Sequence, residues 1–380
     1  MTLTVWARTP DLKRRGQLTV LEGKAVLRDT DVGTWALTVD GASPAARSFS
    51  PGWGIQVYED GQFLLSGPAT EITLKYTGDS TTGPDLEISG VTDSHILADR
   101  LVYPSPGQAA SGQTDAYYTV KSGNAEDILA GLVNTQVGAQ AAAARRVTTL
   151  AAYKSKARGT TSSVNARFSP LLDEVRTIAQ TSGLVVDVVH NSLAAGLELQ
   201  VRERANRSRA VRFRPGKGIK SVTTSFVAPT ANAVLVAGGG QGAARLIKEH
   251  VDTTGGWGGR RVELFQDRRD TTEPAELEKA GQETLQEGRG SARATFEVED
   301  GGVYQFGTHF QLGDTVTLDV GDYQVTEPVR VAELSWDEFG RDGTKVTVGD
   351  PAAESEETTT PMAQKVRALT RAVQGLSARL

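Results

Sequence analysis

Cysteine is absent from the 380 residues of this chain. Its absence excludes disulfide bridges, thiolate zinc sites and cysteine nucleophiles, but it does not assign a cellular compartment. The chain also has no long apolar run of the kind that spans a bilayer, so no membrane span is predicted. The amino-terminal stretch MTLTVWARTPDLKRRG lacks the apolar core of a signal peptide, and export through a standard signal is therefore not expected.

Signatures of catalysis and of metal binding are missing as well. The four histidines are His95, His190, His250 and His309. None of them stands in the zinc-binding spacings H-x-x-x-H or H-E-x-x-H. The chain contains neither the G-x-S-x-G turn of serine hydrolases nor a phosphate-binding P-loop. We therefore expect no enzyme and no cofactor or metal site.

One glycine-rich segment resembles a nucleotide-binding turn. NAVLVAGGGQGAARLI carries Gly238, Gly240 and Ala243 in the spacing G-x-G-x-x-A after an apolar strand. The residues that follow, RLIKEHVDTTGGWGG, are too few for the crossover helix that a dinucleotide site requires. A glycine-rich hairpin is the preferred interpretation.

Charge is nearly balanced over the whole chain, with 41 basic and 46 acidic residues and a net charge of −5. This balance favours solubility and argues against bulk binding of nucleic acid. Segment 201–220 is locally basic, with eight basic residues and one acid, but Phe213 is its only aromatic residue. The alternation from Val211 to Arg214 puts the arginines on the outer face of a strand. A solvated or subunit-facing strand is therefore preferred to a nucleic-acid site.

The length predicts two or three domains, and the 41 glycines fit a chain rich in strands and turns. The pattern predicts an α+β, mainly β fold. Its segments are a β-barrel-like domain (1–103), an α/β domain (104–200), a second β-barrel-like domain (201–350) with an inserted helix (274–287), an acidic linker (351–361) and a carboxy-terminal heptad helix (362–380). In the first domain, one hairpin turns at Asp60-Gly61 and a second spans Thr70–Val91.

Two helices are expected in the α/β domain. Asn124 is a good N-cap for the first; for the second, Ser169 is a good N-cap, Pro170 a good first residue and Gly183 a good stop. Their predicted apolar faces are Ile128, Leu129, Leu132 and Val133 in the first helix, and Leu171, Leu172, Val175, Ile178 and Ala179 in the second.

An internal echo links the two β-rich domains. Phe49, Gly52 and Ile55 recur in the same spacing as Phe310, Gly313 and Val316, and a proline follows each strand at nearly equal distance (Pro68 and Pro328). The pattern is typical of a turn that leads into a half-buried strand. It fits a duplicated domain, and it also fits a turn pattern that recurs by chance in β proteins.

The closing segment 362–380, MAQKVRALTRAVQGLSARL, has apolar residues at heptad spacing. The seam, and the candidate oligomer interface, is Met362, Val366, Leu369, Val373, Leu376 and Leu380. Valine at a positions with leucine at d favours two parallel strands. An amphipathic helix that folds back onto its own core is the alternative, because so short a segment gives fewer than three full heptads.

The order and spacing of several stretches resemble a known family. They are WALTVDG with FSPGWGIQVYEDGQFLLSG, LLDEVRTIAQTSGLVVDV, FVAPTANAVLVAGGGQGAAR, VELFQDRRDTTEPAELEKAGQETLQEG, and FQLGDTVTL with VTVGD, covering residues 20 to 350. The chain resembles tail-associated hub proteins, the minor tail proteins of siphophages of actinobacteria. These are similar in fold to the baseplate hub proteins of contractile phages.

The resemblance implies an architecture and a set of partners. Two related barrels per chain and three chains would give a pseudo-sixfold ring at the virion tail tip, assembled in the host cytoplasm. Such a homotrimer would join the tail tube or distal tail ring to tip or fibre proteins, and it would line or close a channel for DNA or the tape-measure protein. The family favours three strands for the terminal helix, against the two that its local pattern favours.

Two rival functions are compatible with the sequence. A carbohydrate-binding receptor module would need an exposed aromatic platform, for which Trp53 and Trp257 are the candidates. A tail-associated peptidoglycan hydrolase would need a catalytic constellation that the sequence does not display.

Overall fold

The computed structural model describes residues 2–76, 84–191, 196–240, 242, 245–252, 259–269, 271–288, 290–298 and 302–349. The predicted acidic linker (351–361), the six heptad residues of the terminal helix, Ala243 and Trp257 lie outside the described residues. The chain divides into two compact units. Unit 1 comprises Met1–Val222 and Thr295–Val348, and unit 2 comprises Thr223–Ala294 with the residues after Val348. Within the described ranges, no helix has both the length and the apolar character needed to cross a bilayer.

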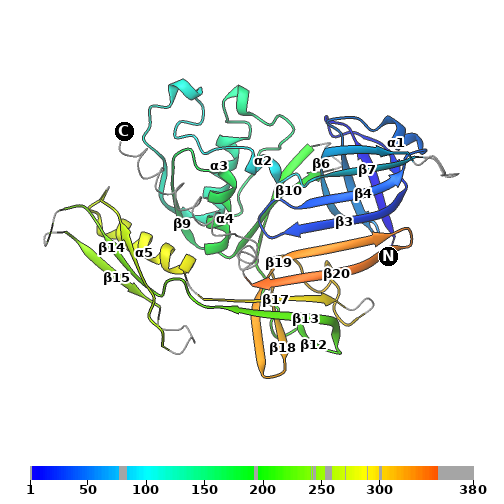
Figure 1. Ribbon diagram of the computed structural model, residues 1–380. Coiled ribbons are helices and arrows are strands. Elements are labelled where there is room, and N and C mark those ends of the chain that lie inside the picture. The colour runs from blue at the N-terminus through cyan, green and yellow to red at the C-terminus, as the bar shows by residue number, and fades with distance from the viewer. Residues whose placement is uncertain are drawn as a thin grey trace. The chain divides into compact units, whose positions relative to one another are not determined.

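The first barrel of unit 1 is an antiparallel sheet that curls on itself (Figure 1). Its elements are β1 (Leu3–Arg8), β2 (Arg14–Leu18), β3 (Val20–Arg28), β4 (Thr34–Asp40), α1 (Pro44–Ser48), β5 (Gly54–Glu59), β6 (Gln62–Lys75) and β7 (Asp85–Val91). The strands pair in the order β3-β4-β7-β6-β5-β1-β2, and only Thr19 separates β2 from β3. Side chains that alternate along these strands point inward, which buries Val5, Leu37, Ile55, Val57 and Ile88.

The second barrel repeats this plan with other strands. They are β12 (Arg212–Pro215), β13 (Gly218–Val227), β17 (Ser291–Val298), β18 (Thr315–Val320), β19 (Tyr323–Asp337) and β20 (Gly340–Gly349). The order is β12-β13-β17-β20-β19-β18, and β12 also pairs with β18, which closes the sheet. Phe213 packs at its centre, with ring centroids 4.6 Å from Phe296 and 5.3 Å from Phe310.

The two barrels share one continuous sheet. Residues Glu22–Arg28 of β3 pair antiparallel with Val331–Asp337 of β19, and we call this ladder the barrel joint. It merges both barrels into a 13-stranded sheet among the described residues. Gly23 lies opposite Trp336, and a Cβ atom there would approach Leu37 to 2.8 Å but the indole ring only to 3.4 Å. The missing side chain at Gly23 therefore leaves room for Leu37 beside the joint.

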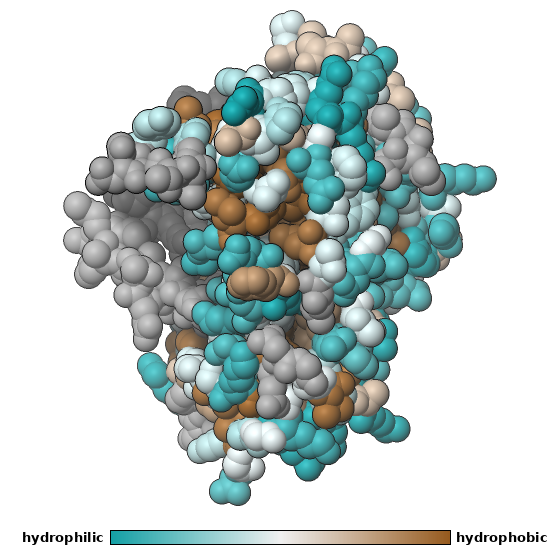
Figure 2. Space-filling model, turned by 90° about the vertical axis from the view of Figure 1, so that its right-hand side faces the viewer, coloured by the Kyte–Doolittle hydropathy of each residue, from teal (hydrophilic) through white to brown (hydrophobic). Residues whose placement is uncertain are grey.

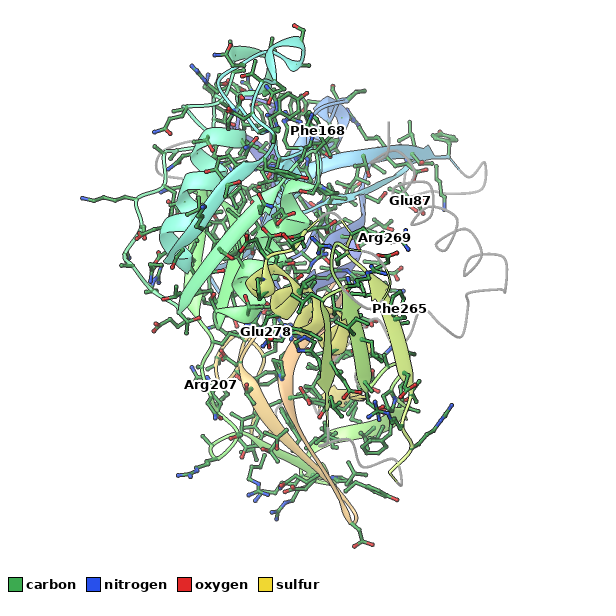
Figure 3. All side chains as sticks on the ribbon, turned by 90° about the vertical axis from the view of Figure 1, so that its left-hand side faces the viewer. Glu87, Phe168, Arg207, Phe265, Arg269 and Glu278 are labelled. Atoms are coloured by element: carbon green, nitrogen blue, oxygen red, sulfur yellow. The ribbon has the colours of Figure 1, made fainter. Side chains whose placement is uncertain are left out.

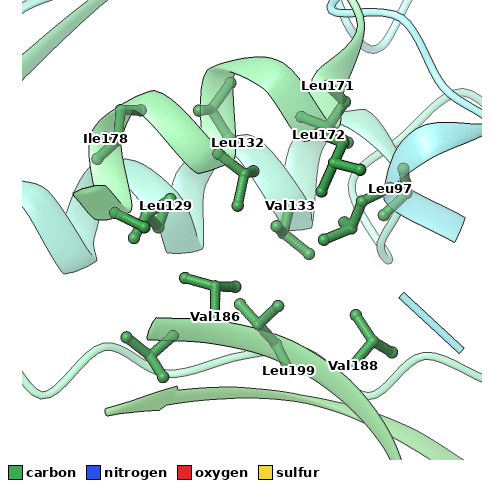
Figure 4. Packing of buried hydrophobic residues seen from close by; sticks show 14 of the residues in the cluster. Leu97, Leu129, Leu132, Val133, Leu171, Leu172, Ile178, Val186, Val188 and Leu199 are labelled. Carbon is green, nitrogen blue, oxygen red and sulfur yellow. The ribbon is translucent and has the colours of Figure 1, made fainter. Parts of the chain in front are cut away.

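The α/β part of unit 1 lies between the barrels in the sequence. Its elements are α2 (His95–Ala98), β8 (Tyr118–Asn124), α3 (Ala125–Gln136), β9 (Thr161–Ala166), α4 (Leu171–Thr181), β10 (Leu184–Asn191) and β11 (Gly196–Glu203), with short 3-10 turns at Ala110–Gly112 and Ala143–Arg145. Leu129 and Leu132 of α3 meet Leu171 of α4 above Val186 and Leu199 of the β10–β11 pair (Figure 4).

The predicted apolar faces of α3 and α4 are confirmed, since every residue named for them is buried. The N-cap of α3 is confirmed too, because the Asn124 side chain accepts from the backbone N–H groups of Glu126 and Asp127. Gly183 takes a left-handed φ of 70° just after α4, as a helix stop requires.

The predicted start of α4 is wrong by one residue. Pro170 occupies the cap position without a capping hydrogen bond, the helix begins at Leu171, and the Ser169 hydroxyl instead donates to Glu174 at 2.8 Å. The cause is a tertiary contact: Pro170 forms a β-bridge with Leu101, which draws the chain before α4 into an extended path.

Unit 2 contains a small sheet covered by one helix. Its elements are β14 (Ala233–Ala237), β15 (Ile247–Val251), β16 (Glu263–Asp267) and α5 (Pro274–Gly288), with the sheet order β15-β14-β16. Val234, Val236 and Leu277 are fully buried in its core. Since β14 runs through the Gly238 turn into the antiparallel strand β15, the hairpin interpretation of this glycine-rich segment is confirmed.

The internal echo corresponds to equivalent backbone geometry. Gly52 and Gly313 both have left-handed φ values, 85° and 78°. Two residues later each chain segment enters a strand, and Gly54 pairs with Pro68 as Thr315 pairs with Pro328.

The match extends beyond the two prolines. A bulge follows each proline directly, at Ala69–Glu71 in β6 and at Val329–Val331 in β19. The register therefore supports a duplicated barrel rather than a chance recurrence of turns.

One strand differs from the sequence expectation. The pattern separates Gly54–Gly67 from a hairpin beginning at Thr70, but β6 is continuous from Gln62 to Lys75. Pro68 is tolerated because it stands where β6 changes partner: β5 pairs up to Pro68, and β7 pairs from Ala69. At this crossing the strands are so close that a Cβ atom on Gly67 would overlap the carbonyl oxygen of Val91.

Replacing Gly67 with alanine should therefore destabilise the first barrel. Relief of the clash requires β6 and β7 to separate, and overpacking of this kind costs about 1–3 kcal/mol. Gly107→Ala is the control, because nothing lies within 4 Å of its Cβ position. Urea unfolding followed by tryptophan fluorescence should show a lower midpoint for Gly67→Ala only. Equal midpoints for the two variants would contradict the close approach.

Candidate functional site

Six of the eight basic residues in the predicted basic segment pair with acidic residues. Arg212 and Arg214 of β12 point outward, as predicted, and both donate to Asp319 of β18, at 3.0 and 3.1 Å. The hydrogen bond from Arg212, aided by Gln324 and Arg214, lowers the pKa of Asp319 to about 2. Paired guanidinium groups are poor phosphate ligands, so this strand face gives no support to a nucleic-acid site.

A second acidic residue, Asp314, binds arginines that precede β12. The buried carboxylate of Asp314 accepts from Arg207 at 2.8 Å and from Arg202 at 3.3 Å, and it also accepts from the backbone N–H of Gln311 at 3.1 Å. Arg207 is labelled in Figure 3. The connection from the α/β part to the second barrel is therefore fixed by Asp314, which follows Gly313 of the repeated turn.

The third acidic residue sits at the end of the barrel joint. Asp29 directly follows β3 and is 5% exposed. Its carboxylate accepts from Arg204 at 2.6 and 3.1 Å and from Arg330 of β19 at 2.6 Å, while its own N–H donates to the Arg330 carbonyl. One carboxylate thus ties the first barrel (β3), the second barrel (β19) and the chain that leaves the α/β part. We call this group the Asp29 clasp.

The first barrel is also tied to the α/β part, through a buried polar cluster. Arg8 of β1 donates two hydrogen bonds to Asp93, at 2.9 and 2.5 Å, and a third to Nδ1 of His190 on β10, at 3.2 Å. The side-chain amide of Gln56 also contacts the His190 ring, and the Ser66 hydroxyl donates to Asp93 at 2.6 Å. All five residues are less than 5% exposed. Buried polar groups that satisfy one another in this way fix a single arrangement of the elements that carry them.

His190 is neutral at pH 7. Burial, together with the adjacent Arg8 guanidinium, lowers the pKa of His190 to about 4. Its Nδ1 atom acts as an acceptor for Arg8, which is only possible when that nitrogen carries no proton. The ring is buried and contacts Arg8 and Gln56, which indicates a structural role for His190.

A cavity of about 830 Å³ opens between β6, β10, β11 and residues 306–312. It is lined by aliphatic residues such as Leu199 and Leu312, with Asp187, Glu198 and Gln200 beside them. No serine, histidine and acid are arranged for nucleophilic catalysis among its described lining residues. In the described part of the chain, no three histidine or acidic side chains come close enough to hold a metal ion.

Trp53, one of the two candidates for an aromatic platform, is partly buried, and its ring centroid lies 5.8 Å from that of Phe49. The second candidate, Trp257, lies outside the described residues, and so do all six heptad residues.

Comparison with known proteins identifies the family. The sequence profile of the Siphovirus ReqiPepy6 Gp37-like proteins matches residues 2–350. The chain belongs to this family. A search of curated protein sequences gave no match. The resemblance to siphophage tail proteins that the sequence suggested is confirmed in family and in fold.

Solved structures of phage tail proteins share the fold of this Gp37-like protein. The 43 kDa tail protein of prophage MuSo2 from Shewanella oneidensis is similar with a TM-score of 0.61 at 13% identity, over 92% of this chain and 99% of that one. A tail protein from Neisseria meningitidis has a TM-score of 0.56 at 13% identity, over 92% and 97%. Prophage tail protein gp18 from Listeria monocytogenes has a TM-score of 0.55 at 11% identity, over 97% and 99%.

The site that these observations define is the barrel joint with its Asp29 clasp. Sequence reasoning missed Asp29, Asp93 and Asp314, because isolated aspartates after a strand or a glycine turn resemble ordinary loop residues. The basic segment was the one available signal: several arginines close together in a nearly neutral chain imply nearby acidic partners.

Asp29→Ala should weaken the clasp strongly. It leaves Arg204 and Arg330 without their acceptor, and removal of one member of a buried ion pair costs about 3–5 kcal/mol. Asp173→Ala removes a solvent-exposed partner of Arg176 and should cost at most about 1 kcal/mol. Chemical unfolding of both variants tests the difference. A similar, small loss for the two would show that the clasp does not stabilise the joint.

The stability contribution of His190 should depend on pH. Its folded pKa, about 4, lies below the ordinary value of 6.5, so the unfolded chain binds a proton first as the pH falls. Stability is therefore lost progressively between about pH 6.5 and pH 4. In His190→Gln this part of the loss should vanish, while acid titration of carboxylates remains. Unfolding free energies measured every half pH unit would reveal it, and parallel curves for both proteins would contradict the assignment.

Proposed function

We propose that this protein is a structural, non-enzymatic hub of the phage tail tip. Three copies would form a ring of six barrels with pseudo-sixfold symmetry, placed between the tail tube or distal tail ring and the tip or fibre proteins. The ring would line or close the channel through which DNA and the tape-measure protein pass.

The observation that carries the proposal is the duplicated barrel with its shared sheet. Each barrel has the same strand order, and equivalent pairs such as Gly54–Pro68 and Thr315–Pro328 stand at the same place in it. A chain that holds two similar modules in fixed orientation presents similar surfaces twice. Three such chains give six similar surfaces, which suits docking to a sixfold tube.

The sequence-based segments complete the proposal. The barrel-like domains at 1–103 and 201–350 would build the ring, and the domain at 104–200 would decorate it. The acidic linker 351–361 would hang the heptad helix 362–380 from the ring, where Val366, Leu369 and their seam partners form a three-stranded tip that contacts downstream proteins. The ring would set the number of strands, because so short a helix is marginal alone.

The mass of the protein in solution tests the ring. Each chain is 40.4 kDa, and light scattering after size-exclusion chromatography should give three times this mass for the full chain. A chain lacking residues 355–380 should give the same stoichiometry, because the barrels and not the helix carry assembly. Monomers of both forms up to high protein concentration would contradict the proposal. Peptidoglycan zymography of the same samples should show no clearing.

A further inference from the structure

The two equivalent strands β6 and β19 differ in what covers their second halves. In β19, residues from Val331 to Asp337 pair with β20 on one edge and with β3 on the other. In β6, residues Ala69–Lys75 pair with β7 on one edge. The other edge of Thr70–Lys75 joins no ladder within the described ranges. Glu87 of β7, labelled in Figure 3, lies beside this segment and pairs with Lys75 at 2.5 Å.

Side chains at the open edge follow the pattern of the barrel joint. Ala332, Leu334 and Trp336 of β19 are all buried at the joint. Counted from the equivalent prolines, Pro328 and Pro68, they match Ile72 and Leu74 of β6 and Tyr76, which directly follows β6. Ile72 is half-buried, Leu74 is 64% exposed and Tyr76 is 78% exposed. Ile72, Leu74 and Tyr76 therefore occupy positions equivalent to residues that the joint buries in β19, but no strand among the described residues covers them.

The strand equivalent to β3 has a complementary open edge. β13 occupies the place of β3 in the strand order, since β13-β17-β20-β19-β18 repeats β3-β4-β7-β6-β5. β12 pairs with Gly218 and Ile219 of β13 only. Beyond them, the outer edge of residues 221–225 carries no ladder in the described part of the chain, whereas the matching edge of β3 pairs with β19.

We propose that Thr70–Tyr76 of one copy pairs antiparallel with residues 221–225 of β13 in the next copy. This contact would repeat the barrel joint between chains. The inference rests on the proposed ring and names the surfaces that close it. Backbone hydrogen bonds would supply the direction of pairing, and burial of Leu74 and Tyr76 would supply apolar contact.

A second copy of this chain is the occupant that the fold specifies. The contact is heterologous, because β6 meets β13 and never β6, so successive copies add head to tail and close if the rotation permits. Open strand edges are normally shielded by charge, proline or a covering element. Figure 2 shows one face of the molecule, on which apolar patches lie among polar residues.

Disulfide trapping tests the pairing directly, because the chain has no cysteine of its own. Thr73→Cys is mixed with Ser221→Cys, Thr223→Cys or Ser225→Cys in turn, which samples neighbouring registers on one strand face. At least one mixture should form a covalent dimer under mild oxidation. The corresponding double variant should form a covalent trimer on a non-reducing gel. Thr73→Cys mixed with Phe339→Cys is the control, since Phe339 is 84% exposed and lies outside both edges.

A charge at the edge provides the second measurement. Leu74→Asp should shift the solution mass from trimer towards monomer, with at least a tenfold weaker association. Phe339→Asp places the same charge at another exposed apolar residue and should leave the mass unchanged. Circular dichroism and melting temperature must match the wild-type protein for both variants, which separates loss of assembly from loss of folding.

The two proposals fail differently. A trimer that persists in Leu74→Asp, with no cross-link from any of the three pairs, would overturn the strand pairing and leave the ring intact. A wild-type chain that stays monomeric and never cross-links would overturn both.

Discussion

The Asp29 carboxylate is the point on which the arrangement of unit 1 depends. It lies at the end of β3, almost without solvent contact, and it accepts hydrogen bonds from Arg204 and Arg330. Two guanidinium groups around one buried carboxylate satisfy its oxygens and cancel its charge, which makes the desolvated group tolerable. Because the three residues come from the first barrel, from the exit of the α/β part and from β19, their geometry fixes three segments at once. Asp314 likewise accepts from two arginines, Arg202 and Arg207, whereas Asp93 holds Arg8, which in turn contacts His190 of the α/β part.

Backbone hydrogen bonds also hold the two barrels together, in addition to the Asp29 clasp. The ladder between β3 and β19 makes the two barrels parts of a single sheet, so neither can rotate without breaking the hydrogen bonds between Glu22–Arg28 and Val331–Asp337. The proposed hub would present equivalent surfaces at fixed angles, and this rigidity suits such a role.

Duplication explains why the two barrels have the same strand register but differ in the segments that connect and cover their strands. Residues that hold the strand order are preserved in kind, as with Phe49 and Phe310 behind the left-handed glycines. Insertions have changed what connects the strands: β3 leads to β4 through a short turn, whereas the long segment 228–290, which contains α5 and its sheet, separates β13 from β17. The open edges of β6 and β13 are the places where, among the described residues, the internal joint has no counterpart.

Local chemistry in the sequence was enough for much of the fold. Apolar periodicity identified the buried faces of α3 and α4, Asn124 marked a helix start, Gly183 marked a helix end and Asp60-Gly61 marked a hairpin. Each of these signals depends on residues within a few positions of one another. The repeated Phe-x-x-Gly turn pointed to the duplication for the same reason.

Long-range contacts decided the rest. The start of α4 depends on a bridge from Pro170 to Leu101, and the continuity of β6 through Pro68 depends on a change of partner strand. The pairing of β3 with β19, which lie near opposite ends of the described chain, follows only from how the barrels close, and so does the choice of Asp29 and Asp314 as arginine partners. Local sequence therefore specified the elements and their repetition. The folded chain alone selected which of the many aspartates and strand edges meet, since burial and sheet order bring together residues whose spacing along the chain carries no signal.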